Sequence, residues 1–384
     1  MHERIMMRDR KIRVGILFGG KSGEHEVSYC SAVSVIGAID KEKYEVVPIG
    51  ITKEGKWISP KESLQALQSG IIEGESAMML INDSSGKALI KIRNNTELNV
   101  SSNKNKIDVI FPVLHGPFGE DGTVQGMLEL ADIPYVGAGV AASAISMDKD
   151  IMKIIFKQNG LPVLDWFCIK RKDWKNKSRI LMDMIHQGIP YPIFVKPSNL
   201  GSSVGITKVH KKDELREAID LASSYDRKIL IERGIENTRE FECSILGNDE
   251  PQTSVVGEVV PAGDFYDYQS KYLDEKTRLI IPAKITQKIA EKIQKIAVSA
   301  FNAVDAAGMA RVDFLYSRKT GEIFLNEINT IPGFTKVSMY PRLWESSGLT
   351  YSDLIDRLIQ LAMERYRDKN QNKTVYNSKL LTEK

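Results

Sequence analysis

The sequence has few cysteines, no long apolar run and almost no net charge. Its three cysteines (Cys30, Cys168 and Cys243) lie far apart, with no Cys-x-x-Cys pair and no cluster with histidine. This spacing predicts neither a disulfide framework nor a zinc site and fits a reducing compartment. No stretch approaches the roughly 18 apolar residues of a membrane-spanning helix. The apolar run after the charged first residues is too short for a signal peptide. These absences predict a cytoplasmic protein with no membrane partner.

The composition that remains is that of an ordinary globular protein. The chain has 384 residues, of which 42% are hydrophobic and 27% charged, and its net charge is +3. This length suffices for two or three domains with proper cores, and the charge gives no indication of nucleic-acid binding. We expect three units, over residues 1–145, 146–240 and 241–384, the last with a polar tail after about residue 367.

Hydrophobic patterning predicts an α/β fold. Residues 12–18 are mostly apolar, which is typical of a buried parallel strand, and further strands are expected over residues 44–51 and 107–114. Ser146 is the predicted N-cap of a helix that ends at Gln158. The later expected elements are strands over residues 167–170, 193–196 and 229–232, and helices over residues 284–304 and 350–362, the latter with Thr350 and Asp353 as a capping box.

Residues 310–335 are the most informative segment. Two runs that alternate polar and apolar residues flank a turn at residues 317–321, which predicts a β-hairpin. Strand side chains repeat every second residue, so Arg311 and Asp313 share one face, as do Glu327 and Asn329 on the partner strand. If the two faces coincide, two carboxylates and an amide oxygen meet beside a guanidinium, and such hard ligands suit Mg²⁺. The alternative is an exposed strand face with incidental charges.

Several basic residues are candidates for binding a triphosphate. A Gly/Ser-rich loop follows Lys196, and its backbone N–H groups and hydroxyls can surround phosphate oxygens. The same loop can also be a mobile lid. Lys149 and Lys271 are further candidates, whereas Lys153 is expected at the surface.

Two residues of the first unit are candidates for binding a substrate. His115 stands at the end of a predicted strand, where open α/β sheets bind ligands, although a loop histidine can also be structural. Glu24 follows the first strand, where a carboxylate either binds an ammonium group or caps the next helix.

Two matches to other motifs are rejected. Residues 15–22 fit the pattern GxxxxGK[ST], but residues 16–18 continue the apolar strand and leave too short a phosphate loop. Ser146 and Lys149, taken with Lys319, resemble the motifs of β-lactamases and penicillin-binding proteins, which form an acyl-enzyme on a serine. No Ser-Asp-Asn lies between them, and Lys319 is in a predicted turn.

Taken together, these segments resemble the D-alanine–D-alanine ligases of the ATP-grasp superfamily. The matching segments are residues 18–28, 111–139, 146–149, 195–209, 265–272 and 310–335. The resemblance implies a three-domain ATP-grasp fold, with an N-terminal Rossmann-like parallel sheet and the nucleotide held between two α+β units. It also implies that ATP activates one D-alanine as an acyl phosphate, which the amine of a second D-alanine attacks. The dipeptide is a precursor of cell-wall peptidoglycan.

The resemblance further implies a role for individual residues. On the nucleotide side, the implied contacts are Lys149, Lys196, Ser203 and Lys271 near the phosphates, and Glu232 and Glu240 near adenine and ribose. Asp313, Glu327 and Asn329 match the ligands of Mg²⁺ or Mn²⁺, with two ions expected. On the substrate side, Glu24 matches the residue that binds the ammonium group of the first D-alanine, and it is linked by hydrogen bonds to Ser202 and Tyr272. Arg311 and the N–H of Gly333 match the groups that stabilise the oxyanion. Ser338 and Met339 match the site for the carboxylate of the second D-alanine, and His115 matches a histidine on the substrate side.

The resemblance leaves some alternatives open. A D-alanine–D-lactate ligase is one, although Tyr272 favours the dipeptide product because members that make the ester tend to have phenylalanine there. Another ATP-grasp ligase is a second alternative, but it would lack the segments 23–28 and 265–272. A relative that only binds ATP would lose the acceptor-side groups, which are present here. A homodimer is implied by the resemblance alone.

Overall fold

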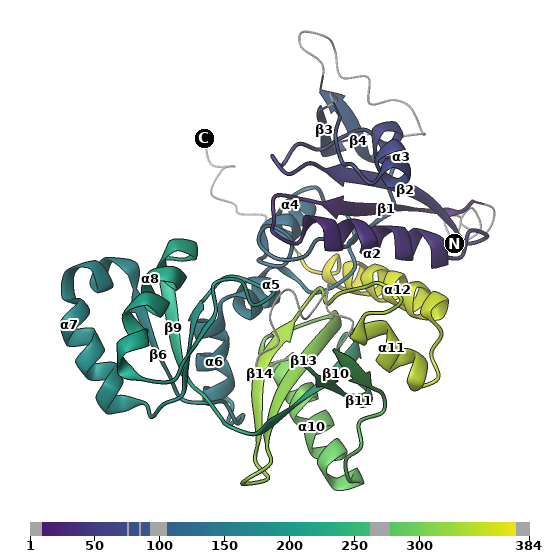
Figure 1. The fold of residues 1–384 in the computed structure, drawn as a ribbon. Coiled ribbons are helices and arrows are strands. Elements are labelled where there is room, and N and C mark those ends of the chain that lie inside the picture. The colour runs from purple at the N-terminus through teal and green to yellow at the C-terminus, as the bar shows by residue number, and fades with distance from the viewer. Residues whose placement is uncertain (1–9, 75–76, 84–85, 93–105, 262–276, 374–384) are drawn as a thin grey trace, which may run out of the picture.

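The structure, a computed structural model, describes residues 10–74, 77–83, 86–92, 106–261 and 277–373. The first unit contains a parallel sheet of order β2-β1-β5 and a separate hairpin of β3 and β4 (Figure 1). Its elements are β1 (Ile12–Gly19), α2 (His25–Ala38), β2 (Tyr44–Ile51), α3 (Pro60–Ser69), β3 (Ala77–Asp83), β4 (Gly86–Ile92), β5 (Val109–Pro112), α4 (Thr123–Leu130) and α5 (Val140–Met147). The predicted parallel strand is confirmed, because Val14, Ile16 and Phe18 of β1 are fully buried.

The second unit is an antiparallel sheet of order β6-β9-β7-β8. Its elements are α6 (Lys149–Gln158), β6 (Trp166–Lys170), α7 (Arg171–Gly188), β7 (Ile193–Pro197), β8 (Thr207–Val209), η2 (Lys212–Glu214), α8 (Leu215–Tyr225) and β9 (Lys228–Arg233). Buried side chains of α7 and α8 form one core with β7 and β9. The three strands predicted from the sequence here are all present.

The start of α6 differs from the prediction. Its N-cap is Asp148, whose carboxylate accepts hydrogen bonds from the backbone N–H groups of Asp150 and Ile151, both at 3.2 Å. Ser146 instead lies inside α5. Aspartate and serine are equally good caps, and the sequence alone does not show that a separate helix ends at Met147. Lys149 is nevertheless the first residue of α6, so it lies in the first turn as predicted.

The third unit is an antiparallel sheet of order β12-β11-β10-β13-β14. Its elements are β10 (Thr238–Gly247), β11 (Gln252–Val260), β12 (Arg278–Ile280), α10 (Gln287–Ala303), β13 (Gly308–Ser317), β14 (Ile323–Asn329), α11 (Met339–Ser346) and α12 (Tyr351–Lys369). The predicted hairpin and both predicted helices are confirmed, and Thr350 caps α12 by accepting from the N–H of Asp353 at 3.2 Å. The predicted boundary at residue 240 falls inside β10, so the domain limits stay a prediction.

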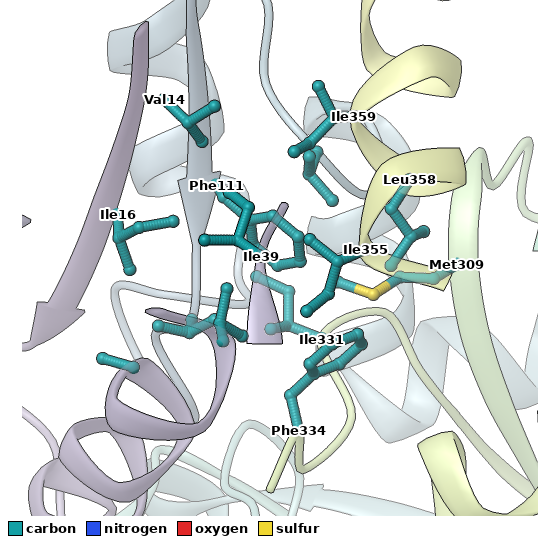
Figure 2. Close-up of a cluster of buried hydrophobic side chains, with 14 of the residues drawn as sticks. Val14, Ile16, Ile39, Phe111, Met309, Ile331, Phe334, Ile355, Leu358 and Ile359 are labelled. Atoms are coloured by element: carbon teal, nitrogen blue, oxygen red, sulfur yellow. The ribbon is translucent and has the colours of Figure 1, made fainter. Parts of the chain in front are cut away.

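One hydrophobic core joins the third unit to the first. Figure 2 shows side chains of β1, α2 and β5 facing those of α12 and of the loop after β14. Its labelled members are Val14, Ile16, Ile39, Phe111, Met309, Ile331, Phe334, Ile355, Leu358 and Ile359. Because this core is continuous, the loop after β14 is held against the ends of the parallel strands. Within the described part of the chain, no helix is both long and apolar enough to cross a membrane.

Candidate active site

A cleft of about 1240 Å³ lies where the three units meet. Every predicted site residue within the described ranges lines it. These residues are Glu24, His115, Lys149, Lys196, Ser202, Ser203, Glu232, Glu240, Arg311, Asp313, Glu327, Asn329, Gly333, Ser338 and Met339. Lys271 and Tyr272 lie outside the described residues. The sequence therefore identified side chains that are far apart in the chain and converge on one cavity.

The hairpin of β13 and β14 brings its polar residues together as predicted. Asp313 stands directly opposite Glu327, and Arg311 directly opposite Asn329. Asn329 donates its amide N–H to Asp313 at 3.1 Å. Arg311 donates two hydrogen bonds to the same carboxylate, both at 2.7 Å. The two faces coincide, so the alternative of an exposed strand face with incidental charges is wrong.

The oxygen atoms of this hairpin fit a magnesium ion. Mg²⁺ is usually bound through one or two carboxylates together with substrate phosphates, and Asp313 and Glu327 supply two adjacent carboxylates facing the cleft. In the described part of the chain, no three Asp, Glu, His or Cys side chains are grouped closely enough to hold a metal ion. Two carboxylates are the number that Mg²⁺ usually takes from the protein when substrate phosphates supply further ligands.

Arg311 is the central cation of the hairpin. Burial alone disfavours its charge, but Asp313 and Glu242 keep its pKa well above the ordinary value. Its Nε atom lies 2.9 Å from the carboxylate of Glu242. Arg311 is therefore a fixed positive charge beside the carboxylates.

Glu24 and Ser202 connect the first unit to the second. Ser202, in the loop after β7, donates a hydrogen bond to the carboxylate of Glu24. Glu24 occupies the N-cap position of α2, but its side chain makes no capping hydrogen bond. The carboxylate packs against Gly116, where an added Cβ would lie 2.7 Å from it. Glu24 therefore places a negative charge at the lining of the cleft.

Lys149 connects the loop after β7 to the hairpin of β13 and β14. Its Nζ donates to the carbonyl oxygen of Leu200 at 2.9 Å and lies 3.5 Å from the carboxylate of Glu327. A single ammonium group therefore stands between the Gly/Ser-rich loop and the hairpin. This is where a phosphate that is bound by both elements would lie.

A buried ion cluster borders the cleft at Lys196 and Glu232. Glu232 forms ion pairs with both Lys153 and Lys196. Burial alone would raise the pKa of Glu232, but the two lysines lower it, while burial lowers the pKa of Lys153. The expectation that Lys153 is at the surface is wrong, because its residue is 1% exposed. Its ammonium group pairs with Glu232 of β9 and lies 5.7 Å from the centroid of the Trp166 ring at the start of β6. The spacing of residues along the helix does not reveal these partners.

Lys153→Met is expected to destabilise the protein by about 3 kcal/mol, because it leaves a buried carboxylate with one cation in place of two. The measurement is the denaturation midpoint of each variant in urea. Lys157→Met is the matched control on the same helix, since that side chain is 65% exposed, and it should cost less than about 1 kcal/mol. Equal losses in the two variants would contradict a stabilising role for the buried cluster.

His115 has both a cleft-lining position and a structural role. Its side chain is buried, with Nε2 lying 2.9 Å from the hydroxyl of Ser31 and Nδ1 lying 3.0 Å from the carbonyl oxygen of Ile331. Burial lowers its pKa. The neutral ring donates through Nδ1 and accepts through Nε2, so it connects α2 to the loop after β14.

The acceptor side of the cleft is formed by the loop after β14 and the start of α11. Ser338 is the N-cap residue of α11, and its hydroxyl accepts from the backbone N–H of Thr335 at 3.1 Å. Met339 is buried against Val259 and Leu343. Gly333 lines the cleft in the same loop. These positions agree with the implied acceptor site, whose role stays a prediction.

Glu120 is a cleft residue that the sequence did not single out. Its carboxylate accepts hydrogen bonds from the N–H of Gly116 at 2.7 Å and from that of Ile331 at 3.3 Å. Burial, and then the charge of Glu24, raise the pKa of Glu120 from 4.5 to about 8. Glu120 lies within the matched segment 111–139, but its burial depends on a loop more than two hundred residues away.

The stability of the protein is expected to fall as the pH rises from about 4.5 to about 8. In this window the folded state retains a proton on Glu120 that the unfolded chain has lost, so deprotonation favours unfolding. Glu120→Gln should remove this part of the slope, and Glu24→Gln should reduce it. Melting temperatures of the three proteins between pH 5 and pH 9 test this. Parallel curves for wild type and Glu120→Gln would rule it out.

The fold and the cleft together define a class of protein. Two antiparallel sheets hold a cleft with a lysine-bearing loop on one side and an acidic hairpin on the other, which is the architecture of an ATP-grasp ligase. A family model described as D-ala D-ala ligase N-terminus matches residues 13–138, and one described as D-ala D-ala ligase C-terminus matches residues 155–360. The chain belongs to the D-alanine–D-alanine ligase family.

Individual relatives agree with this assignment. The chain is 49% identical to the D-alanine–D-alanine ligase of Natranaerobius thermophilus, with 96% of this chain and 99% of the relative covered. It is 51% identical to that of Thermoanaerobacter sp., with 94% and 98% covered.

Two solved structures are similar to this fold. The VanG D-Ala:D-Ser ligase from Enterococcus faecalis has a TM-score of 0.79 at 36% identity, covering 92% of this chain and 100% of that one. The D-alanine–D-alanine ligase from Coxiella burnetii has the same TM-score at 33% identity, covering 94% and 96%.

Proposed function

We propose that this protein joins two molecules of D-alanine, with ATP converted to ADP and phosphate, and so supplies a precursor of cell-wall peptidoglycan. The observation that carries the proposal is the convergence of the three units on one cleft. Glu24 of the first unit contacts Ser202 of the second, and Lys149 contacts both the Gly/Ser-rich loop and the hairpin. A donor carboxylate, a phosphate chain and an acceptor amine can thus be held in one cavity.

The first step is transfer of the γ-phosphoryl group to a carboxylate oxygen of the first D-alanine. Enzymes promote such transfers mainly by positioning the groups and offsetting charge. Lys149 and Lys196 supply positive charge near the phosphates, with Ser203 and Lys271 as further contacts, and Glu232 and Glu240 face the nucleoside. Asp313, Glu327 and Asn329 would hold Mg²⁺ or Mn²⁺, two ions in all, which neutralise phosphate charge when bound.

The donor D-alanine is held by its ammonium group. Glu24 offers a carboxylate for it, and the hydroxyl of Ser202 fixes the direction of that carboxylate. Tyr272 is proposed to extend this chain of hydrogen bonds. The donor carboxylate then faces the hairpin, so that the acyl phosphate forms beside Arg311.

The second step is attack of the acceptor amine on the acyl carbon, which forms the peptide bond and breaks the bond to phosphate. Negative charge develops on the carbonyl oxygen in the tetrahedral intermediate. Arg311 and the N–H of Gly333 are the proposed stabilisers of this oxyanion. Ser338 and the backbone at Met339 hold the acceptor carboxylate, at the start of a helix where anions are favoured.

The acceptor specificity is the finer part of the proposal. The VanG structure is described as that of a D-Ala:D-Ser ligase, so this fold also accommodates another acceptor. The two relatives with higher identity are both D-alanine–D-alanine ligases. Together with Tyr272, this supports D-alanine as the acceptor in preference to D-lactate.

The experiment is to measure ADP formation with D-alanine, L-alanine, and D-alanine with an equal concentration of D-serine or D-lactate, and to identify the products by mass spectrometry. D-alanyl-D-alanine should dominate in every mixture that contains D-alanine, and L-alanine should give no ADP. Preferential incorporation of D-serine or D-lactate at neutral pH would overturn the acceptor assignment while leaving the ligase mechanism in place.

We further propose that the protein works in the cytoplasm, where ATP is available, and that it forms a homodimer. The dimer is supported by resemblance to the family. Sedimentation velocity at micromolar concentration tests it, and a single species with the mass of one chain would contradict it.

A further inference from the structure

We propose that Glu242 is a positioning residue that holds the guanidinium of Arg311 against the reacting acyl group. The proposal rests on the proposed function, because it assigns a supporting partner to the residue that is to stabilise the oxyanion. Glu242 lies on β10 and was not among the site residues predicted from the sequence.

The strand register places Glu242 beside the metal-binding hairpin. Glu242 stands opposite Asp313 on β13, and Asp313 stands opposite Glu327 on β14. One row of three carboxylates therefore crosses three adjacent strands. Arg311 lies one step along the same face of β13, diagonal to Glu242, a separation that long side chains readily span.

The contacts give Arg311 two carboxylate partners of different kinds. Its Nε and Nη2 atoms each donate a hydrogen bond to an oxygen of Asp313 at 2.7 Å. The same Nε atom also lies 2.9 Å from an oxygen of Glu242, which makes an ion pair. Asp313 is a proposed metal ligand, and an oxygen that binds a cation is a weaker acceptor for arginine. Glu242 is outside the proposed metal-ligand set, so its attraction for Arg311 persists whatever Asp313 binds.

Burial makes this attraction strong. The side chain of Glu242 is 7% exposed and that of Arg311 is 16% exposed. Water therefore screens this ion pair weakly, and the attraction between its two charges is stronger than it would be at the surface. A displacement of about 1 Å in a catalytic group can cost about 100-fold in rate, so a partner that fixes Arg311 has a direct effect on turnover.

The same face of the sheet carries the acceptor side of the cleft. Glu242 stands opposite Gly257 on β11. An added Cβ at Gly257 would lie 2.8 Å from Leu343 and 2.9 Å from Met339, so α11 covers this face closely. Glu242 thus lies on the sheet face that joins the oxyanion stabiliser to the proposed site of the acceptor carboxylate.

The test is to compare wild type with Glu242→Gln and Glu242→Asp. The glutamine variant keeps the size of the side chain and removes its charge, so we expect kcat to fall at least about tenfold while the KM for ATP changes less than about twofold. The aspartate variant keeps the charge, but its side chain is one methylene shorter and holds the carboxylate farther from Arg311. Its kcat should lie between those of wild type and the glutamine variant. The affinity for ADP with Mg²⁺, measured by calorimetry, should match wild type in both variants.

Glu258→Gln is the matched control. Glu258 is another buried carboxylate of the same sheet and accepts hydrogen bonds from Arg239 at 2.7 and 2.6 Å. Its loss should lower the melting temperature without the fall in kcat, which separates positioning of Arg311 from a general effect on the sheet.

Each outcome decides the proposal. A folded Glu242→Gln variant whose kcat is within about threefold of wild type overturns the proposal. A loss of affinity for ADP with Mg²⁺ that matches the loss in kcat also overturns it, since Glu242 would then act on the metal. If the glutamine variant does not fold, the aspartate variant decides, and wild-type kcat there overturns the proposal. Absence of D-alanine-dependent ADP formation in wild type would instead count against the proposed function.

Discussion

Glu327→Gln is expected to lower kcat by about 10³-fold, because it removes one of two adjacent carboxylates that would hold the metal ions. Glutamine has nearly the same size but offers a neutral oxygen, which Mg²⁺ binds less well than a carboxylate. The contact between Glu327 and Lys149 would also lose its charge. The measurement is steady-state ADP formation over a range of Mg²⁺ concentrations, and the variant should need more Mg²⁺ to reach its reduced maximum.

Glu322→Gln is the control for this prediction. Glu322 belongs to the turn of the same hairpin, is exposed, and accepts a hydrogen bond from the hydroxyl of Thr320 at 2.7 Å. Its replacement should leave kcat within about twofold of wild type. If Glu327→Gln retained kcat within threefold at ordinary Mg²⁺ concentrations, the proposed metal site would be wrong.

Arg311→Lys is expected to lower kcat by about 10²- to 10³-fold, which is the usual cost of removing one oxyanion donor. Lysine retains the positive charge, so the neighbouring carboxylates stay compensated and the fold should persist. It cannot reproduce the planar fork that contacts Asp313 and Glu242 together. The KM for ATP should change little, because this loss concerns the acyl centre.

Arg357→Lys is the matched control, since that guanidinium lies on α12 and pairs with Glu364 at the surface. It should have wild-type kinetics. A loss of nucleotide affinity in Arg311→Lys equal to the loss in kcat would show that Arg311 serves the nucleotide rather than the oxyanion.

The hairpin could be predicted from the sequence because its information is local. Alternation over residues 311–329 determines which side chains share a face, and one tight turn brings the two strands into register. The buried strand β1 was predictable for a similar reason, since an unbroken apolar run indicates burial on both faces. In both cases the signal lies within about twenty residues.

Other features depended on contacts between distant segments. Lys153 is buried because Glu232 lies opposite it, and that pairing exists only once the second unit has folded. Glu120 is held by the N–H of Ile331, which another unit supplies. The alternation of polar and apolar residues around Glu242 fits a strand, but the sequence does not show that β13 is the neighbour of β10 in the sheet. The charges of the residues and the periodicity of the sequence do not show which distant side chains the fold brings into contact.

The resemblance to a known family supplied roles that neither pattern nor packing provides. The hydrogen bond between Ser202 and Glu24 was an implication of that resemblance, and it is present in the structure. The implied roles of Lys271 and Tyr272 fall outside the described residues and stay predictions.

The most direct measurement of the central claim is ADP formation by the purified protein with ATP and Mg²⁺, with and without D-alanine, together with mass spectrometry of the product. We expect ADP to form only when D-alanine is present, with one D-alanyl-D-alanine released for each ADP, and no turnover with L-alanine. Folded protein that forms no ADP in response to D-alanine, or that forms ADP without dipeptide, would contradict the account.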